Sequence, residues 1–162
     1  MKILNLPRRI HALGVTMIWG LALAVTAPAA WSQPLSIEQV RTDPDPYEPY
    51  RISQAIKAGP FVFVSGQVGM DLQGRLVGGD DVEAQGDQAF RMLRQVLEKA
   101  GSGMDRIVKV NIYLTDMKHF PVVMRLRERH LVRPYPADTI VQVSALALPE
   151  LKIEVDAIAA LK

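Results

Sequence analysis

Several short stretches of the sequence alternate between apolar and polar residues, which is the pattern of a β-strand that buries one face. The clearest is residues 107–115, where one face carries Val108, Val110, Ile112 and Leu114 and the other carries Lys109, Asn111 and Tyr113. Residues 61–64 form a shorter β-prone run between two turn signals, and we expect a buried strand there that pairs with residues 53–58. Residues 139–144 and 151–160 complete the predicted strands.

Two other stretches place their apolar residues at helical spacing. In the first, these positions are Ala89, Phe90, Leu93, Val96, Leu97 and Ala100, and Gly101 stops the helix. Asp80 and Glu83 stand three residues apart ahead of it, as a capping pair would. The second helix is expected over residues 118–131, with Phe120, Val123, Leu126 and Leu131 inward and Arg125, Arg127, Glu128 and Arg129 outward. The prolines at 134 and 136 prevent its continuation.

The order of these elements, ββ(β)αβαββ, predicts an α+β domain in which two helices cover one face of a mixed sheet. The opposite face is too apolar to be left in water, because it includes Phe61 or Val62, Ile140 or Val141, and Ile158. We therefore expect another chain to cover the bare face of the sheet.

The N-terminal residues have the order of an export signal. Lys2, Arg8 and Arg9 precede an apolar run over residues 12–30, and small residues follow. Cleavage after Ala29 and cleavage after Ser32 both fit, and residues 1–32 are assigned to the signal peptide. The arginine pair is compatible with twin-arginine export, but its neighbours favour the general secretory route. The mature protein is therefore expected to be periplasmic or secreted, with no membrane attachment after cleavage.

Residues 33–51 hold four prolines among charged groups, so we expect an extended arm ahead of a single domain at residues 52–162. Removing residues 1–32 takes away three basic residues and no acidic ones, which changes the formal net charge from +2 to −1. A near-neutral domain lacks the positive field of a non-specific nucleic-acid binder. The chain has no cysteine, and His119 and His130, which we expect at the surface, have no partner at metal-ligand spacing.

Three separated segments carry a resemblance to a known family. They are residues 53–67, which include Ser53-Gln54-Ala55 and Ser65-Gly66-Gln67, the strand at residues 109–116, and residues 153–159. In this order they resemble the Rid family, also called YjgF. The resemblance implies a chorismate-mutase-like fold, a homotrimer packed through its sheets, and small-molecule clefts between the subunits. It also implies the hydrolysis of reactive enamines and imines to a ketoacid and ammonia, without a metal or cofactor.

The resemblance assigns site residues as well. Ser65 and Glu154 match family cleft positions, with Glu154 as a water-positioning carboxylate. In the family an arginine after Pro-Ala clamps the substrate carboxylate through two parallel hydrogen bonds, whereas in this chain Asp138 follows Pro136-Ala137. Two further cleft positions differ, because a common tyrosine is Ile52 and a common asparagine is Met124.

Asp138 leaves several hypotheses open. An anion at this position repels a substrate carboxylate, and together with Glu154 it would favour a cationic ligand, or one of the two carboxyl groups would hold a raised pKa and act as an acid. Alternatively, Asp138 only hydrogen-bonds the backbone at the entrance of a strand. A third hypothesis is that another arginine restores the clamp. Arg51, Arg125, Arg127 and Arg133 are near the relevant segments, and Arg51 and Arg133 are the candidates, although helix-face and linker arginines are usually solvated.

The main hypothesis is thus an exported Rid-family protein, an enamine or imine deaminase or a divergent relative with an altered substrate. The alternative is a trimer that binds an amine or another cationic small molecule without turnover. Deamination of the usual imino acid with a substitute arginine is a further alternative. Ribonuclease activity fits poorly with export, an acidic residue in the cleft and a near-neutral charge.

Overall fold

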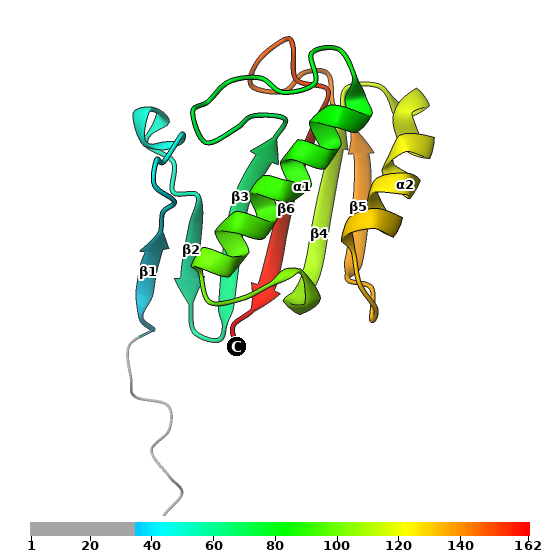
Figure 1. The fold of residues 1–162 in the computed structure, drawn as a ribbon. Coiled ribbons are helices and arrows are strands. Elements are labelled where there is room, and N and C mark those ends of the chain that lie inside the picture. Colours follow the sequence, from blue (N-terminus) through cyan, green and yellow to red (C-terminus); the bar gives the residue numbers. More distant parts are fainter. Residues whose placement is uncertain (1–34) are drawn as a thin grey trace, which may run out of the picture. The chain divides into compact units, whose positions relative to one another are not determined.

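The computed structural model describes residues 35–162, so the predicted signal peptide lies outside the described residues. Six strands form one sheet in the order β1-β2-β3-β6-β4-β5, and both helices lie on the same face of it (Figure 1). Strands β4 and β5 pair in parallel, and the other neighbours pair antiparallel. The predicted mixed sheet with two helices on one face is therefore confirmed. The elements are β1 (Ile37–Val40), β2 (Ala55–Ala58), β3 (Phe61–Val68), α1 (Val82–Lys99), β4 (Ile107–Leu114), α2 (Phe120–His130), β5 (Ala137–Gln142) and β6 (Ile153–Ala160).

The proline-containing segment before β2 contributes to the sheet. Its first part forms β1, which pairs antiparallel with β2 from Ile37 opposite Ala58 to Val40 opposite Ala55. The sequence prediction treated this segment as an arm outside the domain, and it placed the optional strand of its order after residues 61–64 rather than here. The segment then makes a short 3₁₀ turn, Glu48–Tyr50, which brings its two tyrosines, Tyr47 and Tyr50, next to β3.

Both helices begin differently from the sequence prediction. Asp81, not Asp80, caps α1, because its side chain accepts hydrogen bonds from the backbone N–H groups of Glu83 and Ala84 at 2.9 and 3.3 Å. Helix α2 begins at Phe120 after a short 3₁₀ turn, Met117–His119, and the Phe120 ring is partly exposed rather than inward. The predicted inward residues Val123, Leu126 and Leu131 are buried.

Two strand predictions also change in detail. Strand β3 is buried on one face only, because Val62 and Val64 lie in the core while Phe61 and Phe63 are 39% and 45% exposed. In β4 the pairing register with β6 shifts between residues 107 and 109. This bulge turns Val108 outward, where it is 45% exposed, and Ile107 takes the core position instead.

The hydrophobic core lies between the sheet and the helices. Its largest fully buried apolar side chains come from both helices, β4, β6 and the loop before β6, namely Phe90, Leu93, Leu97, Leu126, Ile112, Leu114, Leu151 and Ile153. The opposite face of the sheet carries Phe61, Val141 and Ile158, which decides between the neighbours that the sequence left open. Within residues 35–162, no helix is both long and apolar enough for a membrane span.

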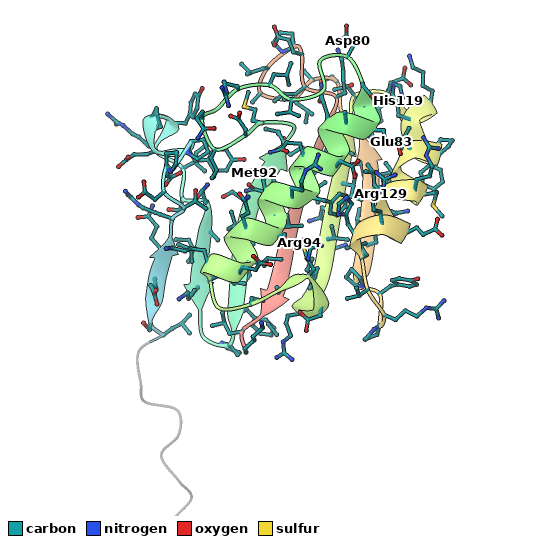
Figure 2. The ribbon with its side chains drawn as sticks, viewed as in Figure 1. Asp80, Glu83, Met92, Arg94, His119 and Arg129 are labelled. Atoms are coloured by element: carbon teal, nitrogen blue, oxygen red, sulfur yellow. The ribbon has the colours of Figure 1, made fainter. Side chains whose placement is uncertain are left out.

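Charged residues join the two helices. Glu83 of α1 pairs with Arg125 and Arg129 of α2, and the Glu83 and Arg129 side chains lie between the two helices in Figure 2. Asp87 pairs with Arg129 at 2.5 Å and accepts a hydrogen bond from His130 Nε2 at 2.7 Å. The His130 ring also stacks on Phe90, with 4.9 Å between ring centroids. The prediction of a surface position for His130 is therefore wrong, because the ring fills a gap between the helices.

Candidate functional site

Five of the seven predicted site residues line two hollows on different elements. The first, which we call the Glu154 pocket, has a volume of about 320 Å³, and its walls include Tyr47, Tyr50, Ile52, Ser65, Leu148 and Glu154. The second, which we call the α2 cavity, has a volume of about 720 Å³, and its walls include Phe120, Met124, Arg127, Tyr135, Asp138 and Ile140. The two hollows share no lining residue in the described chain.

Strand alternation places Glu154 on the bare face of the sheet. Ile153 and Val155 on either side of it are buried toward the helices, so Glu154 points the opposite way. Its carboxyl group lies against the backbone of β3 at Gly66. A Cβ atom added to Gly66 would stand 1.7 Å from Glu154 Oε1, so only glycine leaves room for this contact.

The surroundings of Glu154 favour its protonated form. Burial beneath the pocket walls raises the pKa of Glu154, and the nearby Asp156 carboxylate raises it further. Asp156 is itself held in place, because it accepts hydrogen bonds from Asn111 Nδ2 at 2.7 Å and from the Tyr113 hydroxyl at 2.9 Å. The hydrogen bond from the Tyr113 hydroxyl to Asp156, together with burial, raises the pKa of Tyr113 to about 12. Glu154 is thus a carboxyl group whose proton affinity is tuned upward, as acid–base catalysis at near-neutral pH requires.

Two residues with hydroxyl groups, Ser65 and Tyr47, line the same pocket as Glu154. Ser65 Oγ donates its proton to the Ser53 carbonyl oxygen at 2.6 Å, which leaves the hydroxyl free only as an acceptor. The Tyr47 hydroxyl donates to the Gly66 carbonyl oxygen at 2.6 Å and so ties the N-terminal arm to the strand beside Glu154. Burial raises the pKa of Tyr47 as well, which keeps this donor protonated. Ser65 therefore fits a role in accepting a hydrogen bond from substrate or water rather than that of a nucleophile.

An ion pair forms part of the wall of the α2 cavity. Asp138 in β5 lies opposite Val110, whose side chain faces the helices, so Asp138 points toward α2. There Arg127 donates from Nε to Asp138 Oδ2 at 2.7 Å and from Nη2 to Oδ1 at 2.5 Å. Each side chain is only 22% exposed. Asp138 is consequently neither a lone anion nor a simple backbone acceptor, as the sequence argument had considered, because a guanidinium group neutralises it.

Of the other four predicted residues, two line a hollow and two do not. Ile52 lines the Glu154 pocket and Met124 lines the α2 cavity. Arg51 ends the 3₁₀ turn with a φ of 58° and is exposed, and the Arg133 guanidinium stacks 5.1 Å from the centre of the Tyr135 ring. Neither arginine lines the two hollows. Within one chain, Asp138 and Glu154 thus do not form a joint acidic site.

Among the residues that line these hollows, sequence reasoning missed two tyrosines of the N-terminal arm and the arginine that pairs with Asp138. Tyr47 and Tyr50 belong to a segment that its prolines identify as extended, but proline spacing does not say what the segment packs on. Arg127 has an outward position in the helical pattern, which is typical of a solvated side chain. Its contact with Asp138 exists because the fold places β5 next to α2. Among residues 35–162, no cluster of histidine and carboxylate side chains is suited to hold a metal ion.

Comparison with known proteins shows the family of the chain. A family model described as Endoribonuclease L-PSP matches residues 40–161, and a RutC family protein of Pyrococcus horikoshii is 38% identical over 72% of this chain and 90% of its own length. The chain belongs to the Rid family. Its Rid relatives include the protein named 2-iminobutanoate/2-iminopropanoate deaminase of Dermatophagoides farinae, which is 31% identical over 71% of this chain and 88% of its own.

The fold of the Rid family is also found by structural comparison. The crystal structure of RidA from an Antarctic Psychrobacter species matches with a TM-score of 0.71 and 34% identity. The match covers 76% of this chain and 99% of that one. The predicted chorismate-mutase-like fold and the resemblance to the Rid family are therefore confirmed.

Proposed function

We propose that this Rid-family chain is an enamine or imine deaminase, a hydrolase in which Glu154 is the acid–base group. The observation that carries the proposal is the partly buried Glu154 carboxyl group, with its raised pKa, in a pocket with apolar and tyrosine walls. The likeness to a protein named as an imine deaminase supports the same reaction class.

The reaction needs water and one group that moves protons. The Glu154 carboxylate accepts a proton from water while the water oxygen bonds to the imine carbon, and it returns that proton to nitrogen to give a carbinolamine. The hydroxyl proton then passes to nitrogen as the C–N bond breaks, which releases ammonia and a ketone. Ser65 Oγ accepts a hydrogen bond from the water or from the imine N–H, and the apolar walls limit access of bulk water.

We further propose that the working form is a homotrimer in which the α2 cavity of one copy meets the Glu154 pocket of the next. Two facts support this proposal. Five of the seven expected site residues lie in two hollows that share no lining residue in a single chain, and the bare face of the sheet carries exposed aromatic and aliphatic residues. A small-molecule substrate would then bind between subunits.

The name of the family model raises ribonuclease activity as another candidate. Residues 35–162 carry a formal net charge of −1, and a nucleic-acid phosphate backbone is normally bound by a basic surface. No described feature favours this activity over deamination. The pairing of Asp138 with Arg127 likewise gives no support to an amine-binding trimer without turnover, because Asp138 is not available as a lone anion.

The test is hydrolysis of an imine generated in situ from leucine by an amino-acid oxidase, followed by the release of ketoacid and ammonia. We expect Glu154→Gln to lower the rate by about 100-fold or more. The rate should also fall as the pH decreases through the pKa of Glu154, and this fall should begin above the ordinary value of 4.5 because that pKa is raised.

The matched control is Glu98→Gln, which changes an exposed glutamate on α1. It should leave the rate unchanged. Equal rates for wild type and Glu154→Gln would refute the role of Glu154. Ligand binding with no acceleration by the wild-type protein would favour the binding protein without turnover.

We also propose that the protein is exported, from the signal-like order of residues 1–32, which lie outside the described residues. The N-terminal sequence of the protein recovered from the periplasm or medium tests this. A start at residue 30 or 33 supports export, and an intact Met1 in the cytoplasm contradicts it. The two export routes are separated by blocking each translocase in turn.

A further inference from the structure

One edge of the Arg127 guanidinium remains available in the α2 cavity. Asp138 occupies the side edge of the group, formed by Nε and one N–H of Nη2. The end edge, formed by Nη1 and the other N–H of Nη2, has no oxygen acceptor in the described part of the chain. Among the described residues, the acceptor for Nη1 is Met124 Sδ at 3.6 Å, and a thioether sulfur is a weak acceptor. A guanidinium group can bind one carboxylate on each of these two edges, because both edges present parallel N–H groups.

The fold holds this end edge in a fixed position. Asp138 lies in a strand that pairs with β4, so the ion pair fastens the arginine side chain to the sheet. On another side, the Arg127 guanidinium lies 5.9 Å from the centre of the Phe120 ring. An arginine that is held in this way loses less conformational entropy when it binds a ligand than one that moves freely in water.

The neighbouring arginines of α2 are not available in the same way. Arg125 donates from Nε and Nη2 to Glu83 and from Nη1 to the Pro121 carbonyl oxygen, so both of its edges are engaged. Arg129 donates to Asp87 and Glu83. The α2 cavity thus has one guanidinium with an available edge, among walls that include the apolar side chains of Leu131, Tyr135 and Ile140 and the exposed carboxylate of Glu128.

We propose that Arg127 is a specificity-determining residue that binds the carboxylate of an apolar ligand through its end edge, and that Asp138 is its positioning residue. The apolar walls next to the guanidinium fit a branched or aromatic side chain on the same ligand. In the composite site of the proposed trimer, this ligand is the imine substrate or its ketoacid product. The inference rests on the proposed function for the reaction, but it concerns binding and is tested without turnover.

The experiment measures binding of 4-methyl-2-oxopentanoate and of its methyl ester to the mature protein by calorimetry. We expect the ketoacid to bind at millimolar concentration or below, and the uncharged ester to bind about tenfold more weakly or not at all. Arg127→Gln should weaken binding of the ketoacid by about tenfold or more. Because this variant leaves Asp138 without a partner, the neutral double variant Arg127→Gln/Asp138→Asn is measured too, and it should show the same loss while folding normally.

The control is Arg129→Gln, which changes an arginine on the same helix that does not line the cavity, and it should keep the wild-type affinity. Equal binding of acid and ester, or unchanged affinity in both Arg127 variants, overturns the inference. Absence of ketoacid binding to the wild-type protein overturns it as well. Imine hydrolysis with an unchanged KM in the Arg127 variants would refute this role and leave the deaminase proposal intact. Ketoacid binding that depends on Arg127, without hydrolysis of the imine, would support this role of Arg127 and refute the deaminase proposal.

Discussion

At the scale of single residues, the proposed chemistry depends on how closely Glu154 approaches the neighbouring strand. Gly66 has no side chain, and the Glu154 carboxyl group occupies the space that a Cβ atom would need. The hydrogen bond from the Tyr47 hydroxyl to the Gly66 carbonyl oxygen fixes the same piece of backbone. The position of the carboxyl group therefore depends on a glycine and a tyrosine that take no part in proton transfer themselves.

Gly66→Ala should separate activity from stability. The new methyl group would meet the end of a flexible side chain, so Glu154 can move aside with little effect on folding. We expect the melting temperature to change by only a few degrees, while deaminase activity falls by about 100-fold because the carboxylate is displaced. Gly103→Ala is the control, since a Cβ atom there would also meet the end of a side chain, Asp105 Oδ1 at 2.6 Å, and Gly103 lines neither hollow. Full activity in Gly66→Ala would show that the position of Glu154 is not critical.

At the scale of elements, helix α2 matters because it carries Arg127 and Met124. Its contact with α1 is made by the buried Val123 and Leu126 and by the ion pairs of Glu83 and Asp87. Burial acts to raise the pKa of Asp87, but the hydrogen bonds from His130 and Arg129 outweigh it and lower the pKa. The Asp87 carboxylate is thus stabilised in its charged form by groups of α2.

Asp87→Asn should therefore loosen α2 and lower the free energy of unfolding by about 1–2 kcal/mol at pH 7. A depressed pKa stabilises the fold above the unfolded-state value, near 3.9, and this contribution is lost as the pH falls through the folded-state value. The difference between wild type and variant should therefore shrink below about pH 4. Urea denaturation at several pH values measures it, with the exposed Asp80→Asn as the control. A difference that does not depend on pH would show that the charge of Asp87 is not responsible.

At the scale of the whole molecule, the proposed association depends on the bare face of the sheet. It has a polar centre, where Asn111 and Tyr113 hydrogen-bond Asp156, and an apolar part formed by Phe61, Phe63 and Ile158. Exposed aromatic rings on a sheet face are costly in water and favour burial against another surface. A covering subunit would also bring the two hollows of neighbouring copies together.

Phe63→Glu places a charge in the apolar part of this face and should prevent assembly. We expect the mass from light scattering to fall from that of a trimer to that of a single chain, with loss of activity because the composite site is no longer formed. Arg94→Glu changes an exposed side chain on α1, on the helix-covered side of the sheet (Figure 2), and should leave the assembly intact. A trimer that persists in Phe63→Glu would refute the proposed interface, and a wild-type monomer would refute the trimer.

The local pattern of the sequence was sufficient for most of the fold, because periodicity reports which side of an element is buried. It located both helices and the strands from β2 to β6, and Val123, Leu126, Ile112 and Leu114 are buried as expected. It failed where a backbone irregularity changes the side that faces the core. Val108 continues the alternation in the sequence, but the bulge in β4 turns it outward.

The sequence by itself determined the family and the fold class, because these depend on local motifs and on hydrophobic spacing. The same motifs named Ser65 and Glu154, which line one pocket. It did not determine the charge of the second hollow, which depends on residues brought together by the fold. Asp138 seemed to reverse the charge of the site until the parallel pairing of β5 with β4 placed it against Arg127. The partner of a charged side chain is a property of the tertiary structure, because residues that are distant along the chain or outward in a helical pattern become neighbours only when the elements pack.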